Sequence, residues 1–339
     1  MRIGIANESP QEIAAFRQLL ERSGHQIAWV AVGGQEAVMR CARDRPDLVL
    51  LELHMSTMNG ITTTGRIMRE SPCPILITTA ALDSSFAEVF EALGAGALDV
   101  AHAPVPGCAE IKNSPAAFLT KLERLARLLR PAAAEPGLAN YTPKPTLRQA
   151  TPLVVIGCSA GGPAAVATVL GGLPPEFPAG IIVVQHLDEQ FASGLATWLN
   201  QRSRLPVRVA REGDRPTPGL VQLANATDHL VLLNEDTLGY QVNPRGMAYR
   251  PSIDVFYESV VRHWPGQVLG VLLTGMGHDG AAGLKALRDA GHHTLVQDQA
   301  SCAVYGMPKA AASLNAAAEI LPLERIAPRL RQRLQQPQP

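Results

Sequence analysis

Two series of short aliphatic runs, each followed by a segment of helical periodicity, dominate the sequence. In the first series, strand-like and helical segments alternate in the order 2–6, 10–23, 26–32, 35–44, 47–51, 60–70, 74–79 and 84–93. A fifth strand begins at Asp99, and a last helix covers 114–130. Strict alternation of strands and helices predicts an α/β fold with a doubly wound parallel sheet.

The alternation stops near residue 131 and begins again after residue 152. The break contains five prolines and no apolar period, which predicts an extended linker. Beyond it, strands and helices are expected in the order 153–157, 162–170, 181–185, 191–202, 268–274, 281–290 and 293–296. The stretch 205–233 shows short strand-like runs without a helical period, and we expect an inserted meander there. The predicted organisation is therefore a first α/β domain at 1–130, a linker at 131–151 and a second α/β domain at 152–330.

Composition agrees with two aliphatic domains and argues against two classes of partner. The chain has 339 residues, enough for two domains of about 150 residues each. Aromatic residues make up only 4%, so the cores must be aliphatic, as in buried parallel sheets. Lys and Arg together number 30, as do Asp and Glu, which gives no electrostatic reason to bind nucleic acid. No apolar run approaches about 18 residues, so we expect no direct membrane insertion.

Cysteine usage predicts the compartment. The five cysteines are odd in number, are widely spaced and form no CxxC motif. This pattern argues against a disulfide framework and against a metal site, and it favours the reducing cytoplasm.

The strand at 153–157 leads into a glycine-rich turn that carries a serine. The run LVVIGCSAGG places Ser159 between Gly157 and Gly161, just before an expected helix. This is the G-x-S-x-G arrangement of a nucleophile elbow, in which glycines allow the sharp turn that exposes the serine. The same letters also fit a turn that merely packs or one that holds a phosphate.

Two other strand ends carry the residues that a nucleophilic serine requires. His186 ends the run IIVVQH, and Asp279 lies in the glycine-rich turn of VLGVLLTGMGHDG. A base must take the serine proton, and a carboxylate must orient the base. The carboxyl ends of parallel strands share one edge of a sheet, so we expect these two residues to meet Ser159 there. Their chain order differs from that of the α/β-hydrolases, which disfavours the ordinary lipase or esterase fold.

Several runs of the second domain resemble those of the CheB family, the chemotaxis protein-glutamate methylesterases. They are IGCSAGG, VVQHL, RPSIDVFYESV, LLTGMGHDGA and SCAVYGMPKAA, and they cover most of residues 152–325 in the family's order. The family's catalytic serine, histidine and aspartate fall on Ser159, His186 and Asp279. Ala160 stands where the family often has threonine, which leaves the nucleophile intact.

The resemblance also implies an activity and a substrate. It implies hydrolysis of glutamyl methyl esters, and deamidation of some glutamines, on methyl-accepting chemoreceptor-like proteins during signalling adaptation. The family's oxyanion contribution falls on Met276, and Gly161 and Gly162, in the turn after Ser159, are expected among the residues of the oxyanion site and active-site loop. The esterase needs no cofactor.

Residues 1 to about 105 resemble a response-regulator receiver domain, which has a flavodoxin-like sheet. Glu52 stands at the position of the phosphoacceptor aspartate, and Asn7 and Glu8 stand where the family has two aspartates. Thr79 keeps the hydroxyl position, whereas Ala103 replaces the family's lysine. We therefore expect a degenerate receiver that is a poor Mg²⁺ site and does not take phosphate normally from a CheA-type histidine kinase. In the alternative, Glu52 still accepts phosphate slowly.

Three further alternatives remain at this point. The run GALDV with the altered acceptor pocket is more similar to Wsp-type surface-signalling methylesterases than to flagellar ones. The altered receiver also leaves open an alternative function, in which the chain is a non-catalytic regulatory module that binds receptor helices without hydrolysing them. A phosphate-binding domain is a weaker alternative, because the glycine-rich turn lacks a Walker lysine.

Overall fold

The computed structural model describes residues 1–80, 85–104, 114–129, 151–225, 228–245 and 249–335. The chain divides into two compact units, residues 1–134 and 135–339. The linker predicted at 131–151 lies outside the described residues, apart from Thr151. Within the described ranges, no helix combines the length and the apolarity needed to cross a membrane.

The first unit is a five-stranded parallel sheet with the strand order β2-β1-β3-β4-β5. Its strands are β1 (Arg2–Ala6), β2 (Gln26–Ala31), β3 (Leu48–Glu52), β4 (Ile75–Thr79) and β5 (Asp99–His102). Its helices are α1 (Pro10–Arg22), α2 (Gly34–Arg43), α3 (Gly60–Glu70), α4 (Phe86–Gly94) and α5 (Pro115–Leu128). The predicted doubly wound sheet is confirmed, and Glu52 is the last residue of a central strand.

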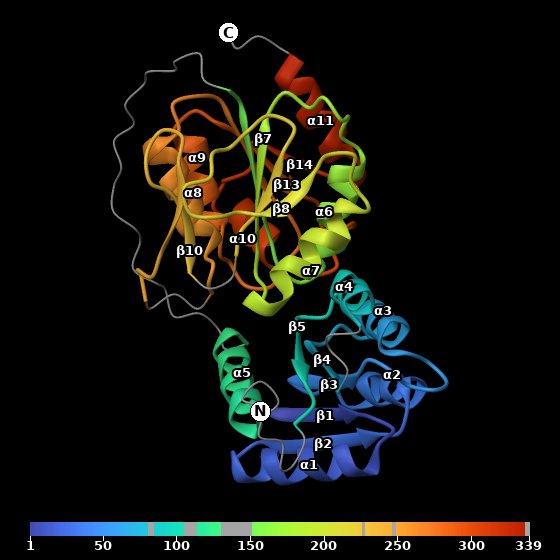
Figure 1. The fold of residues 1–339 in the computed structure, drawn as a ribbon. Helices are drawn as coiled ribbons and strands as arrows, with labels where there is room; N and C mark the ends of the chain where they lie inside the picture. The colour runs from blue at the N-terminus through green and yellow to red at the C-terminus, as the bar shows by residue number, and fades with distance from the viewer. Residues whose placement is uncertain (81–84, 105–113, 130–150, 226–227, 246–248, 336–339) are drawn as a thin grey trace. The chain divides into compact units, whose positions relative to one another are not determined.

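Both faces of this sheet are covered by helices. Helices α1 and α5 share one face, where the rings of Phe16 and Phe118 lie 5.5 Å apart over the aliphatic side chains of Ile3 and Ile5. Helices α2, α3 and α4 lie next to one another on the other side (Figure 1). Both faces of the strands are therefore apolar, as expected for a buried parallel sheet.

The second unit is a seven-stranded parallel sheet with the order β14-β13-β12-β6-β7-β9-β8. Its strands are β6 (Leu153–Cys158), β7 (Gly180–Gln185), β8 (Val207–Val209), β9 (Val221–Leu223), β12 (Val268–Leu272), β13 (His293–Gln297) and β14 (Glu319–Leu321). Its helices are α6 (Gly162–Gly171), α7 (Glu189–Asn200), α8 (Ile253–His263), α9 (Ala281–Asp289), α10 (Met307–Ser313) and α11 (Leu323–Gln335). Helices α8 and α9 lie on one side of the sheet, and α6, α7 and α11 lie on the other (Figure 1).

The expectation of one inserted meander at 205–233 is wrong in part. Strands β8 and β9 pair in parallel with each other, and β9 pairs with β7, so both extend the main sheet. Only β10 (His229–Leu232) forms a separate antiparallel pair, with β11 (Leu238–Gln241). Strands of three residues are too short to show the alternation that identifies a strand in sequence.

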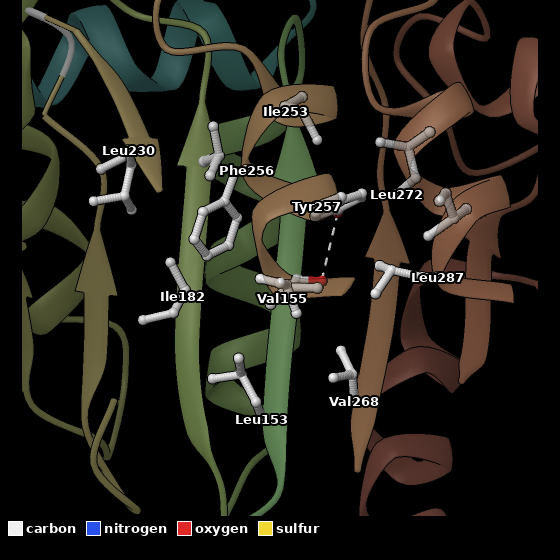
Figure 2. Close-up of a cluster of buried hydrophobic side chains, with 14 of the residues drawn as sticks. Leu153, Val155, Ile182, Leu230, Ile253, Phe256, Tyr257, Val268, Leu272 and Leu287 are labelled. Atoms are coloured by element: carbon white, nitrogen blue, oxygen red, sulfur yellow. Dashed lines mark hydrogen bonds between the residues drawn. The ribbon is translucent and has the colours of Figure 1, made fainter. Parts of the chain in front are cut away.

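Helix α8 is anchored to the centre of the sheet by its buried face. Figure 2 shows Ile253, Phe256 and Tyr257 of this helix against Val155 and other aliphatic side chains of the strands. The Tyr257 side chain is fully buried, and its hydroxyl lies 3.5 Å from the carbonyl oxygen of Val155 (Figure 2). This packing fixes the N-terminal end of α8 above the strand ends.

The strand order places a topological switch point at the carboxyl edge of the second sheet. From β6 the chain moves outward through β7, and it later returns to β12 on the opposite side of β6. Ligands bind at such switch points in open α/β sheets, because the connections leave the edge in opposite directions. The three strands β12, β6 and β7 are adjacent, and each is followed by a turn that carries one of the predicted triad residues.

Candidate active site

Ser159 lies in the sharp turn between β6 and α6. Gly161 has a φ of +80°, in the left-handed region that glycine tolerates best. The N–H of Gly162 donates to the carbonyl oxygen of Ser159 over 2.7 Å. A Cβ on Gly162 would come within 2.1 Å of Oε1 of Gln185. The turn therefore requires glycine at both positions, the first for its backbone angle and the second for its close contact.

Two buried polar side chains fix the backbone of this turn. Gln185 Nε2 donates to the carbonyl oxygen of Ser159 at 2.9 Å and to that of His186 at 3.0 Å. Thr274 Oγ1 donates to the carbonyl oxygen of Ala160 at 2.8 Å, and its own carbonyl accepts from the Ser159 N–H at 3.0 Å. Sequence reasoning missed both residues, because a glutamine or threonine at a strand end has no distinctive pattern.

His186 lies beside the serine turn and faces the predicted carboxylate. Its backbone N–H donates to the carbonyl oxygen of Cys158 over 3.1 Å, which places it next to Ser159. Its Nε2 atom lies 2.7 Å from Oδ2 of Asp279, and both side chains are buried. The structure thus brings Ser159, His186 and Asp279 to one edge of the sheet, where the sequence predicted that they would meet.

Asp279 is held by hydrogen-bond donors at the N-terminal end of α8. Its Oδ2 accepts from the N–H of Ile253 at 2.8 Å, and its Oδ1 accepts from the hydroxyl of Ser252 at 2.8 Å. The N–H of Asp254 adds a third donor at 3.1 Å. Burial alone would raise the pKa of Asp279, but the hydrogen bond and charge of His186 and these N–H groups hold it at about 2.

Asp254 is the buried neighbour of Asp279. Its carboxyl keeps a proton, whereas that of Asp279 is ionised. Burial, and then the charge of Asp279, raise the pKa of Asp254 well above its ordinary value. Its Oδ1 accepts from the N–H of Gly283 at 2.6 Å. Two close carboxyl groups do not both ionise in an apolar site, so the negative charge stays on Asp279. The run RPSID contained a signal for this arrangement, because Ser252 is a helix-capping residue type ahead of an apolar run.

The other nitrogen of the imidazole is available as a base. His186 Nδ1 is buried and has no hydrogen-bond partner among the described residues. A neutral imidazole that donates from Nε2 to a carboxylate keeps a lone pair on Nδ1. Catalytic hydrogen bonds are often loose in structures without substrate and tighten when substrate binds.

Three backbone N–H groups in the two turns next to each other at the serine have no hydrogen-bond acceptor among the described residues. Within the described ranges, the N–H groups of Ala160, Gly161 and Met276 make no hydrogen bond. The Met276 turn lies against the serine, since a Cβ at Gly275 would come within 2.8 Å of the Cβ of Ser159. Gly162 was predicted among the oxyanion-site and active-site loop residues, but its N–H is already bonded to the carbonyl oxygen of Ser159 and is not free for an oxyanion.

The predicted receiver pocket contains a half-buried acidic cluster at the end of β3. Asn7 Nδ2 donates to Glu12 at 2.8 Å and lies 3.3 Å from Oε2 of Glu52. Burial, and then the charge of Glu12, raise the pKa of Glu52 to about 8. Among the described residues, no lysine or arginine pairs with Glu52. Sequence reasoning did not anticipate Glu12, which faces the pocket from α1.

The remaining pocket residues do not complete a cation site. Glu8 accepts from the N–H and the hydroxyl of Ser56, both within 2.9 Å, and Ala103 is buried where a lysine was expected. Thr79 is buried at the end of β4. The amide oxygen of Asn7 already accepts from the N–H of Ser9 at 2.7 Å. Mg²⁺ prefers ionised carboxylates and free carbonyl oxygens, and a Glu52 that keeps its proton at neutral pH does not fit that preference.

Comparisons with known proteins give matches over both units. The family described as CheB methylesterase matches residues 154–330, and the family described as response regulator receiver domain matches residues 3–106. A protein-glutamate methylesterase/protein-glutamine glutaminase 2 of Cupriavidus metallidurans is 52% identical over 97% of each chain. One of the same description, numbered 3, from Pseudomonas aeruginosa is 49% identical over 97% of this chain and 98% of its own. The crystal structure of the Thermotoga maritima CheB methylesterase catalytic domain has a TM-score of 0.52 and 32% identity, and it covers 54% of this chain and 98% of its own.

Proposed function

Because this chain belongs to the CheB methylesterase family and carries a response-regulator receiver domain, we propose that Ser159, His186 and Asp279 are the catalytic triad of its esterase. The protein is a protein-glutamate methylesterase of the methylesterase/glutaminase type. The observation that carries the proposed roles is the 2.7 Å contact between His186 and a fully hydrogen-bonded Asp279 beside a serine elbow.

The first half of the reaction transfers the glutamyl group to the enzyme. Ser159 Oγ attacks the ester carbonyl carbon while His186 Nδ1 takes the hydroxyl proton. The carbonyl oxygen becomes an oxyanion, which the free N–H groups of Ala160, Gly161 and Met276 can hold. As the intermediate collapses, the bond to the methoxy group breaks, and His186 returns its proton to the departing methanol.

The second half releases the product and restores the enzyme. A water molecule attacks the acyl carbon while His186 takes one of its protons, and the bond to Ser159 Oγ then breaks. His186 gives that proton to the departing Ser159 Oγ, and the side chain of the substrate leaves as a free glutamate. A glutamine side chain enters the same sequence, with ammonia leaving in place of methanol.

We propose methylated chemoreceptor-like proteins as the substrate and a histidine kinase of the CheA type as the partner of the receiver. Family membership supports this class of substrate and partner, whereas the assignment to a Wsp-type surface-signalling branch rests on the run GALDV and the altered pocket alone. The test is methanol release by the full chain from receptor preparations of the two pathways, each methylated beforehand. Preferential turnover of the flagellar receptor would contradict the assignment to the surface-signalling branch, and no turnover of either would contradict the substrate class.

We also propose that the receiver does not take a phosphoryl group in the ordinary way. An ionised acceptor must attack the phosphorus in line, and a cation must balance the charge that develops. The raised pKa of Glu52 keeps its carboxyl protonated near neutral pH, and Ala103 provides no charge. These features favour a receiver that stays in one state or responds to protein contact.

A further inference from the structure

Tyr249 covers one face of the proposed catalytic base. Its ring lies parallel to the His186 imidazole, with the ring centroids 3.7 Å apart and an angle of 7° between the planes. The residue follows β11 in the chain and precedes α8, so it reaches the site from outside the three strands that carry the triad. Neither the G-x-S-x-G motif nor the strand pattern contained a signal for it.

The same side chain also reaches the turn that carries Met276. The Tyr249 hydroxyl lies 3.5 Å from the carbonyl oxygen of Met276. A Cβ on Gly277, whose φ is +83°, would come within 3.3 Å of this hydroxyl. One aromatic side chain therefore bridges the base and the turn that offers a free N–H to the oxyanion.

A buried histidine fastens the chain on both sides of Tyr249. His229 is fully buried in β10, and its Nδ1 accepts from the N–H of Ser252 at 3.0 Å. Its Nε2 lies 3.1 Å from the carbonyl oxygen of Pro244, which is the donor geometry of a neutral imidazole. Ser252 in turn donates its hydroxyl to Asp279. The two ends of the segment that contains Tyr249 are thus tied to the same network that holds the triad carboxylate.

We propose that Tyr249 is a positioning residue for the esterase reaction, holding the His186 ring and the Met276 turn in register with Ser159. The proposal rests on the triad roles proposed above. Stacking restricts rotation of the imidazole, so that Nε2 stays on Asp279 and Nδ1 stays free for the serine proton. The negative face of the tyrosine ring also attracts the imidazolium that forms when His186 takes that proton. The ring therefore contributes more to the transition state than to the ground state.

Two substitutions separate the ring from the hydroxyl, and a third controls for stability. Tyr249→Leu removes the ring, whereas Tyr249→Phe keeps it. Tyr240→Leu removes another half-buried tyrosine of the same unit, one whose hydroxyl bonds to the carbonyl oxygen of Ala210 and does not contact the triad. The full chain is assayed for kcat and KM of methanol release from a methylated receptor. A fluorophosphonate then measures the reactivity of Ser159 without any receptor.

A positioning role predicts a split between the kinetic constants. Tyr249→Leu should lower both kcat and the fluorophosphonate labelling rate by about tenfold, the size of one lost cation–π contact, with KM changed less than about twofold. Tyr249→Phe should stay within about threefold of the parent in both readouts, because it keeps the stacked ring and loses only the long 3.5 Å contact between the hydroxyl and the carbonyl oxygen of Met276. Tyr240→Leu should lower thermal stability while keeping the parent kcat.

Three results would overturn the proposal. Unchanged kcat and labelling in Tyr249→Leu would remove any role in positioning. A raised KM with normal labelling would make Tyr249 a receptor contact instead. An equal loss of kcat in Tyr240→Leu would reduce the effect to general destabilisation. Ser159→Ala in the same assay keeps the two claims apart, since its methanol release tests the triad whatever the outcome for Tyr249.

Discussion

His186 meets Asp279 through Nε2, at 2.7 Å, so Nδ1 is the only ring nitrogen left to accept the serine proton. In the chymotrypsin triad the two nitrogens have the reverse roles. Nδ1 is the nitrogen nearer the backbone, and here the backbone of His186 is itself bonded to Cys158, next to the nucleophile. The strand end that carries His186 thus places the base, and the hydrogen bond to Asp279 leaves Nδ1 as the nitrogen that faces the serine proton.

Replacing Asp279 by asparagine should abolish most activity while leaving the fold in place. Both oxygens of the Asp279 carboxylate accept hydrogen bonds. Whichever way the asparagine amide is turned, its NH₂ group would therefore face another hydrogen-bond donor. The imidazole would then lose the acceptor that sets its tautomer, and kcat should fall by about 10³- to 10⁴-fold. Asp289→Asn, on the exposed side of α9, is the matched control and should keep the parent rate. An Asp279→Asn variant that keeps more than about a tenth of the parent kcat would contradict the role of this carboxylate in orienting His186.

Replacing Gly162 by alanine should damage both the stability and the rate. The added Cβ would lie 2.1 Å from Oε1 of Gln185, and overpacking of this kind costs about 1–3 kcal/mol of unfolding free energy. Gln185 also holds the Ser159 backbone, so its displacement should lower kcat. Gly171→Ala, at the end of the same helix, meets only the carbonyl oxygen of Arg202 at 3.4 Å and is the matched control. Urea unfolding and methanol release on both variants check the prediction, and equal behaviour would refute it.

The stability of the receiver should fall as the pH rises from about 4.5 to about 8. Burial and the charge of Glu12 raise the pKa of Glu52 from its ordinary 4.5 to about 8, so in this range the folded chain keeps a proton that the unfolded chain releases. The stabilisation that this proton gives is fully present below pH 4.5 and is lost as the pH rises to about 8. It is worth on the order of 1 kcal/mol or more of unfolding free energy. Glu52→Gln should remove this fall in denaturant melts of the full chain. Glu21→Gln, which removes an exposed carboxyl from α1, should retain it.

Acetyl phosphate should leave the parent chain unmodified. The full chain is incubated with acetyl phosphate and Mg²⁺, and its intact mass is measured for an adduct of about 80 Da, one phosphoryl group. The double variant Glu52→Asp, Ala103→Lys restores an acceptor of lower pKa and a cation, so it should form more adduct than the parent. A stoichiometric adduct on the parent that disappears in Glu52→Ala would show that the receiver accepts phosphate after all.

Much of the fold was predictable because its signal is local and repeated. Each long strand of the two sheets is an aliphatic run, and the helix 60–70 was expected with the bounds that α3 has. The short strands β8 and β9 were not predictable as sheet members, because they pair with strands distant in the sequence. Their place depends on tertiary contacts with β7 rather than on a pattern of their own.

The candidate site likewise has one part that the sequence predicts and another part that it does not. Ser159, His186 and Asp279 follow strands that share one edge, so topology alone brings them together. The groups that position them come from elsewhere. Tyr249 precedes α8 in the chain and stacks on His186. His229 lies in the separate β10–β11 pair and makes hydrogen bonds to the backbone of Pro244 and Ser252. Such contacts depend on where a loop closes in space, which residue types and spacing do not reveal.

The measurement that tests the triad most directly is methanol release from a methylated receptor by Ser159→Ala, beside the parent chain. The structure predicts a loss of at least about a thousandfold, because no other nucleophile replaces the serine and the oxyanion N–H groups alone supply only residual catalysis. Ser203→Ala, after α7 in the same unit, should release methanol at the parent rate. Comparable methanol release by Ser159→Ala and the parent would contradict the mechanism.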